Sequence, residues 1–175
     1  MSLEISFVNK LELVSPSVLT VGASESLHGR FSLIMYDQSI ISIGFGDINS
    51  LIQPSIKIID VIHVDNAAAR LANDLIDGLL EGYQFLAYGA EFQLSVWTLF
   101  LLIKRGETCH YIDIANKLNK STAACAVGNA IAQNPLAVVI LCHRVMPYSL
   151  KLGGYRWGQR IKKLLLNIES GGIYG

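Results

Sequence analysis

Apolar and polar positions in the first half of the chain follow short-period patterns. Residues 31–36 (FSLIMY) and 40–45 (IISIGF) are rich in β-forming residues and are separated by only three positions, which predicts a β-hairpin. Farther along, Asp65 is placed to cap a helix. The apolar positions of that helix recur every three or four residues: Ala68, Leu71, Ala72, Leu75, Ile76 and Leu79. These elements predict an α/β N-terminal domain over residues 1–88.

The pattern of residues 89–175 predicts a second, mostly helical domain. One helix ends before Lys104, and its apolar face follows a period of 3.6 residues: Phe92, Val96, Leu99, Phe100 and Ile103. Residues 111–118 predict a short helix, and a second helix over 122–133 follows an N-cap at Ser121. Two short helices joined by a brief turn are typical of a helix-turn-helix, and equally of a packed helical hairpin.

The C-terminal residues predict one further amphipathic helix. Its apolar face is formed by Ile161, Leu164, Leu165 and Ile168. The opposite face is basic and carries Lys162 and Lys163. Glu169 closes this helix.

An uncharged stretch over residues 121–143 has the length of a membrane span. Polar residues and a proline interrupt it at Asn129, Gln133, Asn134 and Pro135. Because these residues are unfavourable in hydrocarbon, we expect no transmembrane helix. Charged residues near the N-terminus argue against a secretory signal, and the three cysteines form no CxxC pair. We therefore expect a reduced, cytoplasmic protein with no disulfide framework and no zinc.

The overall composition, taken at face value, argues against a nucleic-acid-binding protein. The 175 residues are 51% hydrophobic, and 14 basic side chains balance 14 acidic ones. Split by position, however, residues 1–91 hold four basic and eleven acidic residues, a charge of −7, whereas residues 92–175 hold ten basic and three acidic residues, a charge of +7. This asymmetry favours a basic working surface on the second half, although a contact between the two halves would also explain it.

The densest set of reactive groups is Cys142-His143-Arg144, which follows an apolar run over 136–141. A thiol beside a histidine and a cation can shift toward the nucleophilic thiolate. The histidine then needs an orienting carboxylate, and Glu169, at the end of an apolar helix face, is the best placed in this half. A Glu–His–Cys relay is therefore one interpretation. The alternative is an inert buried cysteine, a core histidine and a solvated glutamate.

Several motifs of the second half occur in the order found in one known family. The run Leu141-Cys142-His143-Arg144-Val145 resembles the active-site signature Pro-Cys-His-Arg-Val of the O6-alkylguanine-DNA alkyltransferases. Further similar segments are Val96-Trp97, Gly106-Glu107-Thr108, Ala126-Val127-Gly128, Asn134-Pro135, Leu164-Leu165 and Gly154-Tyr155-Arg156-Trp157-Gly158. The last is particularly similar to the alkyltransferase domain of the bacterial adaptive-response protein. Gly44-Phe45-Gly46-Asp47 gives the first half a weaker likeness.

The resemblance implies a fold and a function. The N-terminal lobe would be ribonuclease-H-like, and the C-terminal lobe mostly helical with a winged-helix-like helix-turn-helix. The protein would be a monomer without a cofactor that repairs double-stranded DNA from the minor groove. It would transfer a methyl or alkyl group from O6-alkylguanine, with O4-alkylthymine as a further candidate substrate, to Cys142 in a single turnover. The alternative is a diverged lesion-binding protein with weak or no transfer.

The resemblance also implies residue roles. His143 would draw off the thiol proton through a water, Glu169 would orient the imidazole, Asn134 would brace the cysteine turn, and Tyr111 would bond guanine N3 and help to turn the nucleotide out. The flipped base would be held by Val145, Tyr155 and Arg156. Contacts to DNA would come from Tyr111, Lys120, Ala123, Ala124, Cys125, Gly128 and Arg144.

Two positions depart from the family pattern. Cys125 occupies the place of an arginine that fills the gap left by the flipped base, so we expect weaker duplex binding and slower flipping. Leu141 replaces the signature proline, which would loosen the turn that carries the nucleophile.

Overall fold

The computed structural model describes residues 4–9, 19–26, 28–52, 62–64, 71, 74–75, 79–149 and 152–172. The chain forms two compact units. The first unit comprises Met1–Ala90 together with Pro135–Val139, and the second comprises Glu91–Asn134 and Ile140–Gly175. The division falls two residues from the predicted boundary, but five residues of the sequence's second half pack in the first unit.

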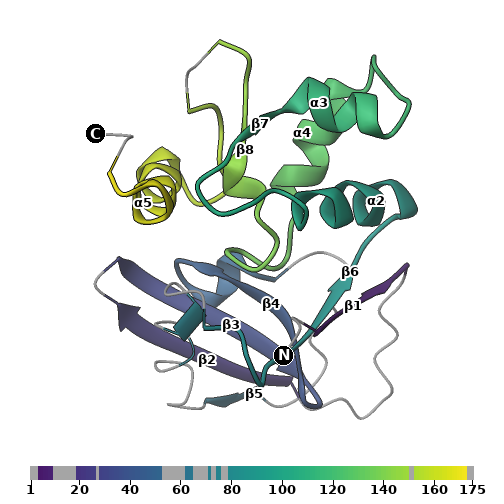
Figure 1. Cartoon of the computed structure of the whole chain (residues 1–175). Coiled ribbons are helices and arrows are strands. Elements are labelled where there is room, and N and C mark those ends of the chain that lie inside the picture. Colours follow the sequence, from purple (N-terminus) through teal and green to yellow (C-terminus); the bar gives the residue numbers. More distant parts are fainter. Residues whose placement is uncertain are drawn as a thin grey trace. The chain divides into compact units, whose positions relative to one another are not determined.

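A six-stranded mixed sheet in the order β1-β6-β4-β3-β2-β5 forms the first unit (Figure 1). Its strands are β1 (Glu4–Val8), β2 (Leu19–Ser26), β3 (Gly29–Tyr36), β4 (Ser39–Phe45), β5 (Ile62–Val64) and β6 (Gln84–Tyr88), with a 3₁₀ turn η1 (Ile48–Ser50) after β4. The predicted hairpin is confirmed as β3 and β4, which pair antiparallel. Asp37 takes φ 55° in the connecting turn, a conformation that aspartate tolerates better than most residues.

The core of the first unit explains why its strands are so apolar. From Ile40 to Phe45 every residue of β4 is buried, which requires cover on both faces of the sheet. One buried cluster consists of Leu19, Val21, Ile34, Ile41, Leu51 and Tyr88. The helix predicted after Asp65 falls largely outside the described residues. Within it, positions 71, 74 and 75 are helical, and Leu71 and Leu75 are buried.

The second unit is mostly helical. Its elements are α2 (Glu91–Phe100), β7 (Cys109–His110), α3 (Tyr111–Lys117), α4 (Ala124–Ala132), the 3₁₀ turn η2 (Cys142–Arg144), β8 (Val145–Met146) and α5 (Gln159–Ser170). The indole of Trp97 on α2 donates to the carbonyl of Ala130 on α4 at 2.9 Å, which fixes these two helices together.

The predicted N-cap at Ser121 is wrong. Helix α4 begins at Ala124, with Ala123 as an N-cap that lacks a side-chain hydrogen bond. Ser121 lies in a preceding turn, which is closed by the Ala123 N–H donating to the Lys120 carbonyl at 2.8 Å. The connection from α3 also needs a residue with positive φ, supplied by Asn119 at 55°. The turn is therefore longer, and the helix shorter, than the sequence pattern predicts.

Helix α5 is rotated relative to the prediction. Lys162 is completely buried, whereas Lys163 is exposed. The buried face carries Ile161, Lys162, Leu165 and Leu166. The assignment of both lysines to a solvent face is thus wrong for Lys162.

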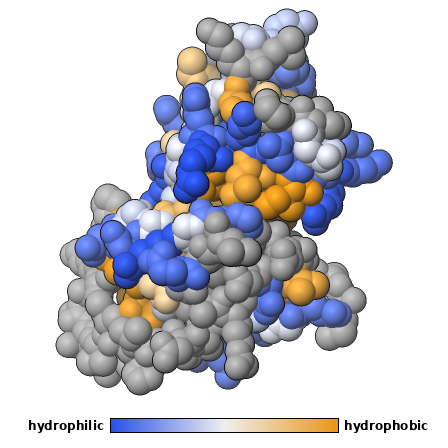
Figure 2. Space-filling view, turned by 90° about the vertical axis from the view of Figure 1, so that its left-hand side faces the viewer, coloured by the Kyte–Doolittle hydropathy of each residue, from blue (hydrophilic) through white to orange (hydrophobic). Residues whose placement is uncertain are grey.

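The high apolar content of the sequence is largely internal. On the face shown in Figure 2, hydrophilic residues surround one larger apolar area. The stretch over 121–143 forms turns, α4 and a buried irregular segment. Within the described parts of the chain, no helix combines the length and hydropathy of a membrane span.

The segment Pro135–Val139 joins the edge of β4. The Ile43 N–H donates to the Pro135 carbonyl at 2.8 Å, and the Ala137 N–H donates to the Ile43 carbonyl at 3.0 Å. One residue later, buried Val138 takes φ 69°. Because a β-branched residue is disfavoured in this region, the backbone is strained four residues before Cys142.

Replacing Val138 with glycine or alanine tests this strain. Both substitutions remove the buried branched side chain, but only glycine relieves the left-handed backbone. We expect V138G to be more stable than V138A by about 1 kcal/mol in urea unfolding. In helix α4, the same comparison should have the opposite sign: A126G should lose about 0.5–1 kcal/mol. A V138G variant less stable than V138A would contradict the strained geometry.

Candidate active site

Cys142 lies at the start of η2, in a turn that hydrogen bonds hold from two sides. Its own N–H donates to the Ile140 carbonyl at 2.7 Å. The Asn134 side-chain amide donates to the same carbonyl and to Cys142 Sγ, both at 3.0 Å. The Asn134 carbonyl accepts a bond from Arg156 Nη1 at 3.2 Å. Buried Asn134 therefore braces both the backbone and the sulfur of the cysteine.

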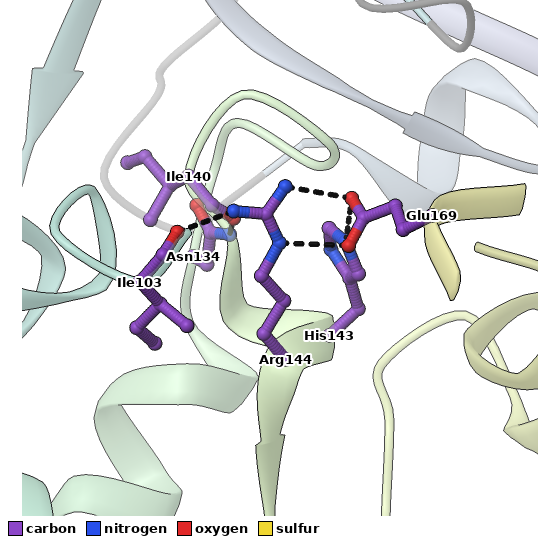
Figure 3. A network of polar contacts seen from close by, with 6 residues as sticks. All are labelled: Ile103, Asn134, Ile140, His143, Arg144 and Glu169. Atoms are coloured by element: carbon purple, nitrogen blue, oxygen red, sulfur yellow. Dashed lines mark hydrogen bonds and ion pairs between the residues drawn. The ribbon is translucent and has the colours of Figure 1, made fainter. Parts of the chain in front are cut away.

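Glu169 on α5 collects three hydrogen bonds from η2 (Figure 3). Its Oε1 accepts from His143 Nε2 at 2.9 Å and from Arg144 Nη2 at 2.8 Å, and its Oε2 accepts from Arg144 Nε at 2.8 Å. Arg144 Nη1 also donates to the Ile103 carbonyl just beyond α2. The bidentate geometry suits the planar guanidinium and satisfies an anion that would otherwise be costly to bury.

This network fixes the ionisation of both acid and base. Burial favours the neutral carboxyl, but the hydrogen bonds and charges of His143 and Arg144 outweigh it and hold the pKa of Glu169 at about 2. Burial lowers the pKa of His143, although Glu169 opposes this shift. A neutral imidazole that donates Nε2–H to Glu169 presents a lone pair at Nδ1, and Nδ1 has no hydrogen-bond partner among the described residues.

The expected shift of Cys142 toward thiolate is wrong for the resting protein. The side chain is fully buried, and burial raises the pKa of the Cys142 thiol to about 11. The Asn134 hydrogen bond, the charge of Lys162 and the nearby Tyr155 hydroxyl lower the thiol pKa but do not overcome the loss of hydration. Cys142 is therefore a thiol at rest, and a base would have to remove its proton before the sulfur could act as a nucleophile.

Lys162 is a site residue that the sequence interpretation missed. Its Nζ donates to the Val145 carbonyl at 2.7 Å, and burial lowers the pKa of Lys162 to about 8, against the opposing influence of Cys142. A usable signal was present, because Lys162 and Glu169 are seven residues apart and therefore share one face of a helix. The inward orientation inferred for Glu169 implied the same for Lys162.

Parallel pairing of β7 with β8 places Tyr111 beside the cysteine turn. Cys109 pairs with Val145 and His110 with Met146, so α3 starts next to the strand that follows η2. Burial and the proximity of Cys142 raise the pKa of Tyr111.

The Tyr155 hydroxyl is buried near the same sulfur. It lacks strict hydrogen-bond geometry to any described partner, but burial and the proximity of Cys142 raise the pKa of Tyr155 well above its usual value. Its ring packs edge-on against Trp157 at 5.2 Å between centroids. Tyr111 and Tyr155 therefore both lie near the sulfur.

The predicted DNA contacts fall into two groups. Cys125 and Lys120 are exposed, and Ala123, Ala124 and Gly128 are half-buried. A Cβ added at Gly128 would meet no atom within 4 Å. The assignment of Arg144 to DNA contact is contradicted, because the residue is only 6% exposed and all three guanidinium nitrogens donate to Glu169 or Ile103. Arg144 instead neutralises Glu169.

Comparison with known proteins agrees with this geometry. Residues 91–171 match the family model described as 6-O-methylguanine DNA methyltransferase, DNA binding domain. An inducible methylated-DNA–protein-cysteine methyltransferase of Bacillus subtilis is 47% identical over 82 residues, which are 47% of this chain and 46% of that protein. A methylated-DNA–protein-cysteine methyltransferase of Methanosarcina barkeri is 40% identical over 108 residues, covering 61% of this chain and 68% of that protein.

A solved structure extends the similarity to both units. The crystal structure of Mycobacterium tuberculosis OGT in complex with DNA matches 89% of this chain and 96% of its own, with a TM-score of 0.72 and 29% identity. The fold is thus that of an alkyltransferase, with a mixed sheet and helices. The chain belongs to the methylated-DNA–protein-cysteine methyltransferase family, although it spans only about half the length of the Bacillus relative.

The Glu169 network makes the free energy of unfolding depend on pH. The folded carboxyl stays charged down to a pH of about 2, whereas the unfolded one takes up a proton near 4.5. Its contribution is therefore complete above pH 4.5 and is lost as the pH falls toward 2. We expect E169Q to lose about 3 kcal/mol at pH 7, and the difference from the wild type to shrink by about 2 kcal/mol at pH 3, in urea unfolding. E107Q, at an exposed glutamate, is the control. An E169Q deficit that does not change with pH would contradict this assignment.

Leu141 occupies the signature proline position with a backbone suited to proline. Its φ is −74°, within the range that a proline ring imposes. Its N–H takes no part in the bonds of the turn, which run from Cys142 to Ile140 and from Arg144 to Leu141. We expect L141P to be about 0.4–1 kcal/mol more stable than L141A, because proline restricts the unfolded chain. The opposite order would mean that Ile140 cannot adopt the extended backbone required before proline.

Proposed function

We propose that the protein repairs DNA by transferring a methyl or other alkyl group from O6-alkylguanine to Cys142, once per molecule. The observation that carries the proposal is the arrangement around one buried sulfur: Asn134 bonds to it, and the neighbouring His143 is oriented by Glu169. An inert core cysteine has no need of an oriented base. O4-alkylthymine, which carries its alkyl group on a similar exocyclic oxygen, is a further candidate substrate.

The proton of Cys142 leaves first. His143 donates its Nε2–H to Glu169 in a hydrogen bond, which leaves the lone pair at Nδ1 free to act as a base. This lone pair accepts the thiol proton through one intervening water. Glu169 then stabilises the imidazolium that results. This order agrees with the raised pKa of the thiol, since a resting thiolate would need no base.

Two neighbouring groups stabilise the thiolate once it forms. The cationic Lys162 and the Tyr155 hydroxyl both lower the pKa of Cys142, and attraction between charges is stronger in a site without bulk water. The Val145 carbonyl that holds Lys162 keeps a second lone pair, which can accept from the amine of a bound guanine.

Transfer itself is a displacement at carbon. A bond forms between Cys142 Sγ and the alkyl carbon while the bond from that carbon to guanine O6 breaks, and the electron pair stays with the purine. The released guanine takes up one proton, which balances the proton removed from the thiol. Tyr111 donates a hydrogen bond to guanine N3 and favours this leaving group. The thioether is stable, so the protein acts once.

Helices α3 and α4 would form the DNA-binding element. We propose that they are a helix-turn-helix of winged-helix type, that α4 enters the minor groove of double-stranded DNA, and that the first unit is ribonuclease-H-like. Small side chains at Ala124, Cys125 and Gly128 keep the partly exposed face of α4 slim, as a narrow groove requires. The excess of basic residues after residue 91 supplies phosphate contacts. The protein would act as a cytoplasmic monomer.

Mass measurement tests the transfer. After incubation with a duplex containing one O6-methylguanine, we expect the protein to gain one methyl group, located on Cys142 by peptide mapping. C142S should gain none, whereas C109S and C125S should still be methylated. Lesion binding without any gain in mass would favour the alternative, a diverged lesion-binding protein. Methylation of C142S would overturn the assignment of the acceptor.

A further inference from the structure

Tyr148 exposes an aromatic ring directly after the active-site strand. It is 81% exposed, compared with 67% for Leu102 and 60% for Leu79, and it has the highest value among the exposed large apolar side chains of the described residues. It follows β8 by two positions and therefore lies six residues after Cys142. Exposing so large a ring forgoes the stability that burial would provide.

The ring of Tyr148 is nevertheless held in place. It lies against His110, with centroids 5.1 Å apart and an angle of 54° between the planes. The pairing of His110 with Met146 puts the two rings on adjacent strand ends. A tyrosine ring offers a large contact surface at a low cost in conformational entropy, because its side chain has only two torsions to fix.

The same strand ends lie beside the turn that carries Cys142. His110 is followed directly by Tyr111, and Pro147 directly precedes Tyr148. A Cβ added at Gly153 would lie 2.7 Å from Pro147 Cδ and 3.4 Å from the Tyr111 hydroxyl, so Pro147 and Tyr111 converge on one point. We call Tyr148 and His110 the aromatic shelf. The shelf therefore adjoins Tyr111, the side chain that would contact the flipped base.

We propose that the aromatic shelf stacks against a base of the DNA strand next to the flipped nucleotide. This inference rests on the proposed function. Base stacking on an aromatic ring is tolerant of sequence, as a repair protein that reads a lesion requires. The partner is nucleic acid because ten of the thirteen charged residues after residue 91 are basic. The exposed face of α4 carries no aromatic side chain, and its Cys125 offers little stacking area.

Transfer rates on two substrates test the shelf. On a duplex with one O6-methylguanine, Y148A should react about 5- to 150-fold more slowly than the wild type at subsaturating protein, the range expected for loss of one base–aromatic stack. Y148F should stay within about twofold, because it keeps the ring. On free O6-methylguanine base, all three proteins should react equally. L102A, which removes another exposed apolar side chain of the same unit, should behave as the wild type on both substrates.

A fluorescent base locates the contact. In a duplex with 2-aminopurine next to the lesion, flipping of the lesion alone unstacks the probe and raises its fluorescence. Stacking on Tyr148 should quench part of this rise in C142S, and the double variant C142S/Y148A should give the brighter complex. C142S/Y148F should resemble C142S. Because these variants cannot transfer, the measurement remains informative if the wild type gains no methyl group, a result that would overturn the proposed function alone.

Three results would overturn the shelf itself. The first is an unchanged duplex rate in Y148A. The second is an equal loss on duplex and free base, which would place Tyr148 at the bound base itself. The third is the same fluorescence in the C142S and C142S/Y148A complexes.

Discussion

The carboxylate of Glu169 is the group on which the second unit depends. It neutralises Arg144, orients His143 and connects α5 to η2, while Arg144 continues the connection to the carbonyl of Ile103 beyond α2. A half-buried anion can occupy this place only because three donors satisfy it. The same contacts that make the carboxylate tolerable also select the imidazole tautomer. Stability and the proposed chemistry are therefore inseparable here.

A second constraint acts through the chain before the nucleophile. Pro135–Val139 is anchored on β4 by backbone hydrogen bonds, and Asn134 and Ile140, on either side of this segment, clasp Cys142. Val138 holds a backbone conformation that a free valine would avoid. Strain of this kind persists only where the surroundings determine the geometry on both sides.

Sequence patterns predicted the hairpin, the helices of the second unit and the cluster of cysteine, histidine and glutamate. These features have local causes, namely period, turn residues and the neighbouring positions 142–144. The errors concern properties that depend on packing. The resemblance implied that Arg144 would contact DNA, and the helix pattern placed Lys162 on the outer face, but partners far along the chain, Glu169 and Val145, bring both inside. The ionisation of Cys142 was misjudged because its neighbours favour the thiolate while burial, which sequence does not reveal, favours the thiol.

That last opposition has a functional meaning. Thiolate character governs oxidation and reaction with stray electrophiles as well as the intended attack. A protein that uses its cysteine once loses everything if that cysteine reacts with the wrong partner. Burial keeps Cys142 protonated and out of solvent, while His143 is ready to act as a base and Lys162 to stabilise the anion. Under the proposed function, reactivity would develop only when a substrate is bound and the proton can leave. Under the proposed function, the raised pKa of about 11 would protect a nucleophile that cannot be regenerated.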